Sequence, residues 1–150
     1  MHTSASPDEI RSQKAGLEST VEIYPQFEPG LKGLDGFSHI FVLGYFHALR
    51  PEQIGPLQVK PKRLVRYGLK LDELPTVGVF ALDSPTRPNA IGLSLVRLIS
   101  RERNRLRVSG LDFFDGTPVL DVKPYEEGYR SEAFDVPEWH SRLRKLAGRV

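Results

Sequence analysis

The stretch HIFVLGYFH, residues 39–47, is the part of this sequence that decides the fold. β-Branched and aromatic side chains follow one another in it almost without interruption. Such a run is typical of a strand that is covered on both faces. We therefore predict that residues 39–47 form a central strand of a sheet.

Short apolar runs on either side of this stretch supply further strands. Residues 21–24 alternate apolar and polar side chains and end at Pro25, which indicates a half-buried strand. Turn-forming residues separate four other runs: residues 76–81, 93–99, 106–111 and 118–122. This spacing predicts an antiparallel barrel or sandwich. We expect a mainly β chain whose residues 1–150 form a single small antiparallel β-barrel-like domain, with a long surface loop and a short C-terminal helix.

The C-terminal helix is predicted by its start and stop signals. Asp135 can cap the first turn, Pro137 suits an early helical position, and Glu138 completes a capping box. Apolar side chains then recur at helical spacing, and Gly148 follows as a stop signal. These apolar residues are Trp139, Leu143 and Leu146.

The long surface loop covers residues 50–72, where three prolines interrupt the chain and no helical period is visible. Residues 50–70 hold six lysines and arginines against Glu52 alone, a charge density that suits the phosphates of RNA. The alternative is a solvated loop, or one whose charges meet the acidic residues of segment 109–138. The candidate RNA-binding residues are Lys60, Lys62, Arg63 and Arg66.

Composition narrows the class of protein. The 150 residues are 39% hydrophobic and 27% charged, as in one globular domain with its own core. Cysteine is absent, which excludes disulfides, zinc-thiolate sites and a cysteine nucleophile. No apolar run is long enough to span a bilayer, and no secretory signal is visible. We expect a cytoplasmic protein without a membrane partner.

The net charge of +2 conceals a polarised chain. Residues 97–107 carry five arginines against Glu102, whereas residues 109–138 carry eight carboxylates against Lys123 and Arg130. The arginine-rich segment is either a solvated strand face or a second surface for an RNA backbone.

Residues 83–94, DSPTRPNAIGLS, form the most unusual segment. Two prolines stiffen it, and Gly92 lets the backbone approach a neighbour closely. The guanidinium of Arg87 suits a carboxylate or phosphate, and the amide of Asn89 can donate and accept hydrogen bonds at once. The segment either binds a ligand or is a structural turn in which Asn89 bonds to its own backbone.

Carboxylates and one histidine are the candidates for acid–base chemistry. Asp115 belongs to an Asp-Gly turn, and Asp121 alternates with valines along a predicted strand. With Asp112 they match no calcium or two-metal spacing, so we predict no metal site. His47 ends the central strand, where it could face a pocket, whereas His39 is better explained as a buried structural histidine.

The sequence has no Rossmann glycine fingerprint, no phosphate-binding P-loop motif and no G-x-S-x-G elbow. A nucleotide-like cofactor would therefore have to be held by loops between strands.

Several separated motifs run from about residue 2 to residue 125: HTS (2–4), GLDGFSH (33–39), FH (46–47), GVFA (78–81), RPN (87–89), IGLS (91–94) and the stretch 115–125. In this order they resemble the TrmO family of tRNA methyltransferases, also called TsaA-like or YaeB-like proteins. The resemblance implies a small β-barrel-like domain that binds S-adenosylmethionine without a Rossmann sheet, usually as a homodimer with sites near the subunit interface.

The same resemblance implies methyl transfer to N6 of N6-threonylcarbamoyladenosine at position 37 of threonine tRNA. It also implies which residues contact the cofactor: Gln13, Lys14, His47, Ala48, Asp83, Arg87, Asn89, Leu93, Ser109, Gly110, Leu111 and Asp112. Asp83 stands where the family has an arginine, and Ala90 replaces the usual proline. We expect the C-terminal extension of bacterial members to be absent.

Residue chemistry adds three candidates for the proton acceptor in methyl transfer, namely His47, Asp112 and Asp115. A sulfonium cation favours nearby carboxylates and aromatic faces, such as those of Asp112, Asp115, Phe113 and Tyr45. Two hypotheses compete with the enzyme: a non-catalytic RNA-binding barrel and a regulatory dimer that binds S-adenosylmethionine.

Overall fold

The computed structural model describes residues 17–146, which divide into two compact units. The first, here called the sheet unit, comprises residues 17–48 and 90–129. The second, the loop unit, comprises residues 49–89 and 130–146. The strands predicted before and after residues 49–89 therefore belong to one unit, although that segment separates them along the chain.

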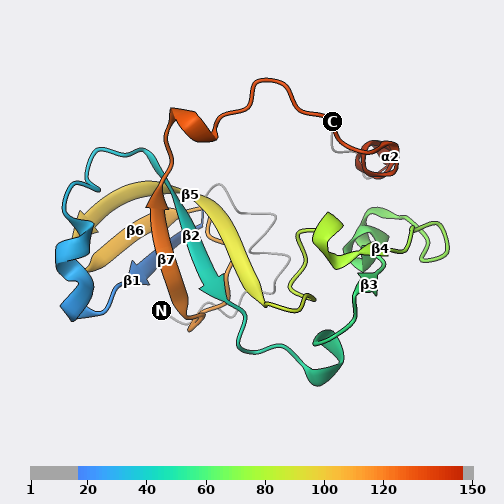
Figure 1. Ribbon diagram of the computed structural model, residues 1–150, viewed down its shortest axis with the longest axis horizontal. Coiled ribbons are helices and arrows are strands. Elements are labelled where there is room, and N and C mark those ends of the chain that lie inside the picture. Colours follow the sequence, from blue (N-terminus) through green and yellow to red (C-terminus); the bar gives the residue numbers. More distant parts are fainter. Residues whose placement is uncertain (1–16, 147–150) are drawn as a thin grey trace. The chain divides into compact units, whose positions relative to one another are not determined.

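The sheet unit is a five-stranded antiparallel sheet with the order β1-β6-β5-β2-β7 (Figure 1). β2 (His39–Tyr45) pairs with β5 (Ile91–Glu102) on one side and with β7 (Val119–Pro124) on the other. The predicted central strand is therefore an interior strand, but it ends at Tyr45, two residues earlier than predicted, and only alternate residues of it are buried. β6 (Arg105–Ser109) and β1 (Glu18–Glu22) continue the sheet beyond β5.

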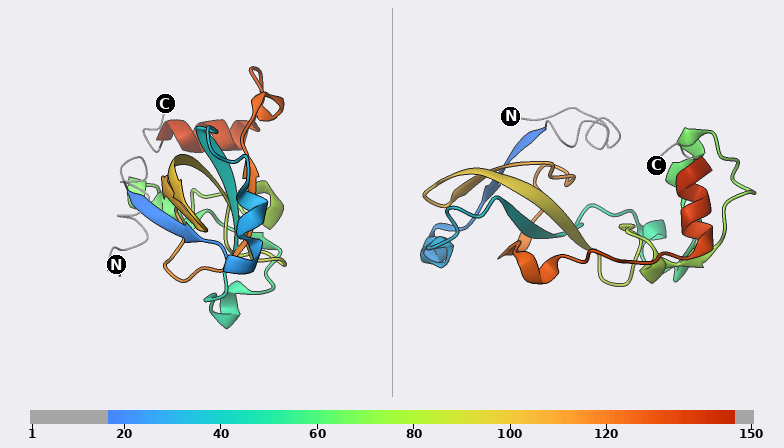
Figure 2. Two further views of the ribbon diagram at one scale, coloured as in Figure 1. Left: turned by 90° about the vertical axis from the view of Figure 1, so that its left-hand side faces the viewer. Right: turned by 90° about the horizontal axis from the view of Figure 1, so that it is seen from above.

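The sheet is curved but open. β5 bends along its length (Figure 2), and its register with β6 shifts between Leu98 and Ser100. Such a bulge increases the local bend and twist. β1 and β7 are the two edges, and no pairing joins them within residues 17–146. The prediction of a mainly β, antiparallel fold is confirmed, and "barrel-like" describes only its curvature.

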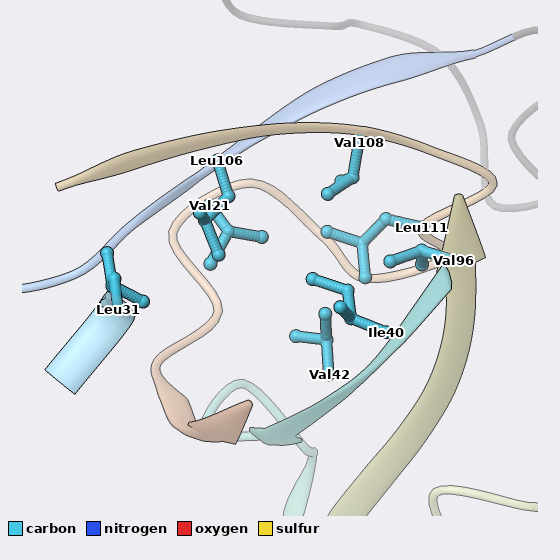
Figure 3. Packing of buried hydrophobic residues seen from close by; sticks show 8 residues of the cluster. All are labelled: Val21, Leu31, Ile40, Val42, Val96, Leu106, Val108 and Leu111. Carbon is cyan, nitrogen blue, oxygen red and sulfur yellow. The ribbon is translucent and has the colours of Figure 1, made fainter. Parts of the chain in front are cut away.

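Aliphatic side chains from the inner face of the sheet form the core (Figure 3). Side chains alternate along a strand, so Ile40 and Val42 of β2 lie on the same face as each other. The 3-10 helix η1 (Pro25–Leu31) adds its last residue. Burying one such side chain stabilises the fold by about 1.5–3 kcal/mol. The cluster consists of Val21, Leu31, Ile40, Val42, Val96, Leu106, Val108 and Leu111.

β5 buries the smaller side chains of its alternating sequence. Gly92, Ser94 and Val96 are buried on the inner face, whereas Leu93 and Leu95 are 56% and 42% exposed on the outer face. The more apolar face of this strand therefore lies away from the core.

The loop unit contains short elements and one α-helix. They are η2 (Pro51–Gln53), β3 (Gln58–Val59), η3 (Lys62–Tyr67), β4 (Val77–Gly78), η4 (Val79–Ala81) and α2 (Glu138–Leu146). The predicted strand at residues 76–81 is wrong after Gly78. β4 pairs only with the two-residue β3, and the chain then turns into η4, where the Leu82 N–H donates to the carbonyl of Val79.

α2 confirms the predicted C-terminal helix. It begins directly after Pro137, whose carbonyl oxygen accepts hydrogen bonds from the N–H groups of His140 and Ser141. Leu143 is buried against Leu69 and Leu74. Leu146 is exposed, and Gly148 lies outside the described residues. Neither α2 nor any other helix within residues 17–146 has the length and apolar character that crossing a bilayer requires.

Candidate functional site

Two glycines near the end of β2 make room for aromatic rings. Gly44 of β2 and Gly92 of β5 are partners in the register of the two strands. A Cβ atom at Gly44 would lie 2.5 Å from Cε2 of Phe113, and one at Gly92 would lie 2.8 Å from Cε1 of the same ring. Carbon atoms do not pack this closely, so the two glycines form a seat that a larger residue would fill.

The rings of Phe46 and Phe113 meet edge to face, with centroids 5.5 Å apart and planes at 86°. This is a favourable arrangement for two aromatic quadrupoles. Phe46 directly follows β2, and Phe113 lies in the segment between β6 and β7. Their neighbours along the chain are His47 and Asp112. The structure therefore brings the segments of these two predicted catalytic residues to the same end of β2.

Asp112 is anchored to the inner face of β5. The hydroxyl of Ser94 donates a hydrogen bond of 2.9 Å to Oδ1 of Asp112. Ser94 is only 1% exposed, whereas Asp112 is partly exposed. A hydrogen bond to an ionised carboxylate is stronger than one between neutral groups, so this contact fixes the position of the Asp112 side chain.

Asp115 occupies the predicted turn. Gly116 has φ +76°, a conformation that glycine adopts without strain, and the Thr117 N–H donates to the carbonyl of Phe114. Asp115 is exposed on this turn, in the same segment as Asp112. The three predicted catalytic residues thus lie on two segments that the Phe46–Phe113 contact holds together.

Only some of the predicted cofactor residues of the sheet unit lie in the segments that the Phe46–Phe113 contact joins. Ala48 follows His47, and Ser109 and Gly110 lead from β6 to Asp112. Gly110 has φ +86°, and its N–H donates to the carbonyl of Leu17. The side chain of Leu111 belongs to the core, so it does not point to a ligand.

Leu93 lies apart from these residues. Its side chain is on the outer face of β5, whereas its neighbour Ser94 points to the inner face and to Asp112. The structure therefore brings the backbone of Leu93, but not its side chain, to the predicted site.

The remaining predicted cofactor residues belong to the loop unit or lie outside the described residues. Asp83, Arg87 and Asn89 belong to the loop unit. There Nη2 of Arg87 donates to the carbonyl oxygens of Val79 and Leu82, at 3.0 and 2.9 Å, and so ties η4 to the RPN turn. This contact supports the structural interpretation of the segment. Two further predicted residues, Gln13 and Lys14, lie outside the described residues.

The predicted RNA-binding residues lie in the loop unit, at and just before η3. Nζ of Lys60 donates to the carbonyl of Leu71, and Lys62 is exposed. The side chains of Arg63 and Arg66 are outside the described part of the structure.

Three of the five arginines of residues 97–107, namely Arg101, Arg105 and Arg107, pair with carboxylates of the sheet unit. Arg107 pairs with Glu18 at 2.8 Å, and Nε of Arg101 lies 3.0 Å from both carboxylate oxygens of Asp35. These hydrogen bonds lower the pKa of Glu18 and of Asp35 below their ordinary values. These ion pairs neutralise part of the positive charge of this segment.

The outer face of β7 carries another ion pair. Asp121 lies opposite Leu43 in the register and pairs with Lys123 at 2.8 Å. The hydrogen bond from Lys123 lowers the pKa of Asp121, and Asp121 in turn raises the pKa of Lys123. Beyond β7, Tyr129 of η5 (Glu127–Tyr129) packs edge to face on Phe41. Asp121 is thus separate from Asp112, which faces the inner side of the sheet.

The chemistry of the side chains near the Phe46–Phe113 contact is compatible with a cation. A fixed carboxylate and two aromatic rings are groups that attract a sulfonium cation. The part of the chain that the structure describes contains no group of three or more histidine, aspartate or glutamate side chains placed to hold a metal ion.

Comparison with known proteins decides the family. The tRNA-methyltransferase O N-terminal domain matches residues 3–130, which is most of the chain. This chain belongs to the TrmO family. The matched range includes residues of both the sheet unit and the loop unit.

Relatives of this TrmO-family chain are found in archaea and in mammals. It is 43% identical over 109 residues to a "Probable S-adenosyl-L-methionine-binding protein" of Pyrococcus abyssi, which covers 73% of this chain and 53% of the relative. It is 39% identical over 150 residues to a tRNA (adenine(37)-N6)-methyltransferase of Mus musculus, which covers 97% of this chain and 32% of the relative. The chain thus spans about half and about a third of these two proteins.

A solved structure has the same fold. The crystal structure of TrmO from Pseudomonas aeruginosa superposes with a TM-score of 0.60 at 34% sequence identity. The match covers 84% of this chain and 49% of that one. The recognition of a TrmO-family chain and of its fold is therefore confirmed.

Sequence reasoning missed some of the residues that assemble this end of the sheet. The close approach predicted at Gly92 is confirmed by its contacts with Phe46 and Phe113, but no role is predicted for Ser94 or Gly44. One signal pointed to them: in a strand whose other face holds isoleucine and leucine, a glycine and a serine at alternate positions mark a place where other groups approach closely.

Proposed function

We propose that this chain carries the S-adenosylmethionine-dependent methyltransferase site of a TrmO protein and that it acts on adenine 37 of tRNA. The acceptor we propose is N6 of N6-threonylcarbamoyladenosine in threonine tRNA. One observation carries the proposal within the structure: the Phe46–Phe113 contact gathers the segments of His47, Asp112 and Asp115 at one end of β2. The names of the relatives support the cofactor and the tRNA substrate.

The proposed reaction needs positioning more than covalent chemistry. When bound, S-adenosylmethionine supplies a methyl group on a positively charged sulfur. The acceptor nitrogen would approach that methyl group in line, within about 3–3.5 Å. As the nitrogen–carbon bond forms, the carbon–sulfur bond would break and leave S-adenosylhomocysteine, whose sulfur is neutral. Asp112 would attract the positive charge of the cofactor, and His47, Asp112 or Asp115 would accept the proton that N6 loses.

The other predicted residues complete this proposal. The cofactor contacts include the loop-unit residues and the N-terminal pair, namely Asp83, Arg87, Asn89, Gln13 and Lys14. The tRNA backbone contacts the basic residues at η3, namely Lys60, Lys62, Arg63 and Arg66. We assign residues 1–150 to one TrmO-like domain, supported by the family match over residues 3–130, and the protein to the cytoplasm, where tRNA is a substrate.

A methylation assay on defined tRNAs tests the function. The full chain is incubated with S-adenosylmethionine labelled in its methyl group and with threonine tRNA that carries or lacks the threonylcarbamoyl group. We expect label in the modified tRNA only. Asp112→Asn should reduce the rate about tenfold or more, whereas Asp121→Asn, a matched change on the outer face, should leave it unchanged.

Other outcomes would replace the proposal. Transfer to both tRNAs would remove the threonylcarbamoyl group from the specificity. Cofactor binding without transfer to any tRNA would indicate the regulatory protein, and tRNA binding without cofactor binding would indicate the RNA-binding module.

We also propose a homodimer that forms through the outer face of β2 and β5. Large apolar side chains are exposed there, and monomeric proteins seldom expose such a group on one face. A second copy of the chain would cover them in a symmetric interface, because a two-fold contact uses the same surface twice. The residues are Tyr45, Ile91, Leu93, Leu95 and Ile99.

Light scattering tests the dimer. We expect about twice the 16.9 kDa mass of one chain. Leu95→Glu should halve that mass, whereas Ile54→Glu, a change at another exposed apolar residue, should not. A wild-type mass of one chain would overturn the dimer and leave the methyl-transfer proposal standing.

A further inference from the structure

Ser94 stands out among the buried side chains. Among the side chains that the structure describes, it is the one polar side chain classed as buried, and it is only 1% exposed. A buried hydroxyl costs stability unless it forms a hydrogen bond. Ser94 forms one, to Oδ1 of Asp112 at 2.9 Å.

Packing alone does not explain a hydroxyl at this place. The inner-face neighbours of Ser94 are Gly92 and Val96 along β5 and Val42 across the register, none of which has a polar side chain. Alanine would bury no polar group here. The hydroxyl is therefore explained by the hydrogen bond that it donates to the carboxylate of Asp112.

The backbone next to that carboxylate is fixed from a second side. Phe113, directly after Asp112, rests on the seat formed by Gly44 and Gly92 and touches Phe46. Phe113 is thus held through its ring, and its neighbour Asp112 is held through its carboxylate. Two independent anchors leave the Asp112 side chain little freedom, and a rigid charged group binds an oppositely charged ligand with a smaller loss of entropy.

We propose that Ser94 is a positioning residue that holds the Asp112 carboxylate in place to recognise the positive charge on the sulfur of S-adenosylmethionine. The inference rests on the proposed function, because it assumes that this cofactor binds at the Phe46–Phe113 end of the sheet. To the proposed function it adds that Asp112 recognises the positive sulfur of the cofactor and that Ser94 holds Asp112 in position.

Two probes that differ in that charge make the test. S-adenosylmethionine carries a positive sulfur, whereas S-adenosylhomocysteine lacks the methyl group and is neutral at sulfur. Calorimetry on the full chain gives the dissociation constant of each. We expect Ser94→Ala to weaken S-adenosylmethionine binding about tenfold, as loss of a hydrogen bond to a charged group predicts, and S-adenosylhomocysteine binding about twofold or less.

Three further variants keep the test sharp. Ser94→Thr retains the hydroxyl and should restore preference for the charged ligand. Asp112→Asn keeps an oxygen for Ser94 to bond but removes the charge, so it should abolish the preference even if Ser94→Ala fails to fold. Ser100→Ala, an exposed serine on the same strand, is the matched control and should bind both ligands as the wild type does.

The failures are distinguishable. Wild-type protein that binds neither ligand would overturn the proposed function itself. Wild-type protein that binds both, with the ratio of the two dissociation constants unchanged in Ser94→Ala and in Asp112→Asn, would overturn the role of Ser94 and Asp112 while leaving the methyltransferase proposal intact.

Discussion

Replacing Gly92 with alanine tests the seat beneath the two rings most directly. The new Cβ would overlap Cζ of Phe46 and lie 2.8 Å from Cε1 of Phe113. Both rings are partly buried, and Phe113 packs against the core, so neither can simply swing into water. Overpacking of this kind costs about 1–3 kcal/mol of unfolding free energy. For a chain of this size, that cost lowers the melting temperature by about 2–12 °C.

Thermal unfolding followed by circular dichroism measures the effect. Gly30→Ala is the matched control, because a Cβ there has no heavy atom within 4 Å and should change the stability by about 0.5 kcal/mol or less. Combining Gly92→Ala with Phe46→Leu should recover part of the loss, because the smaller side chain vacates the space that the new methyl group needs. The double variant should therefore be more stable than the sum of the two single changes predicts.

The displacement of the two rings by Gly92→Ala should also affect ligand binding. A methyl group that moves Phe113 moves Asp112 with it, so Gly92→Ala should weaken S-adenosylmethionine binding, whereas Gly30→Ala should not. A melting temperature of Gly92→Ala equal to that of Gly30→Ala would refute the close contact between glycine and rings. Strictly additive losses in the double variant would refute the role of Phe46 in it.

Three other predictions use different parts of the chain. Arg87→Ala should lower the melting temperature, because two carbonyls lose their donor, and should weaken cofactor binding about tenfold; unchanged calorimetry would leave Arg87 with the structural role alone. Replacing Lys62 and Arg63 together with alanine should weaken tRNA binding and reduce its salt slope by about one to two ions, measured by titration at several salt concentrations, with cofactor affinity unchanged. Arg101 lowers the pKa of Asp35 in the folded state, so Arg101→Gln should be less stable than wild type above the ordinary carboxyl pKa of 3.8. Thermal unfolding measured at falling pH should show this difference in stability disappear as Asp35 is protonated. A difference that stays constant with pH would contradict the linkage.

Local sequence was sufficient for features that depend on neighbours along the chain. A nearly uninterrupted run of β-branched and aromatic residues made β2 recognisable as an interior strand. Only one of its faces is fully buried within the chain, because Ile40 and Val42 are buried whereas Tyr45 on the other face is 46% exposed. The Asp115-Gly116 turn and the helix after Pro137 were likewise predictable, since turn conformation and helix initiation are set within a few residues. The order of motifs identified the family.

The assembly of the candidate site depended on tertiary structure. The bond from Ser94 to Asp112 joins residues 18 positions apart, and the register of β2 with β5 places Gly44 beside Gly92. Register is a property of two strands together, so no single segment specifies it. The same holds for the contact of Phe46 with Phe113, which requires both strands and the segment after β6.

β5 shows most clearly where sequence reasoning ends. Its smaller residues, Gly92, Ser94 and Val96, alternate with larger ones such as Leu93 and Leu95, whereas the prediction for residues 93–99 uses only their character as an apolar run. Hydrophobicity alone assigns the larger side chains to the core, yet the structure buries the smaller ones. The reason is steric: the inner face must accept two phenylalanine rings and a carboxylate from other segments, and only glycine and serine leave them room. Sequence therefore determined that β5 has two faces, and tertiary packing decided which of them is inside.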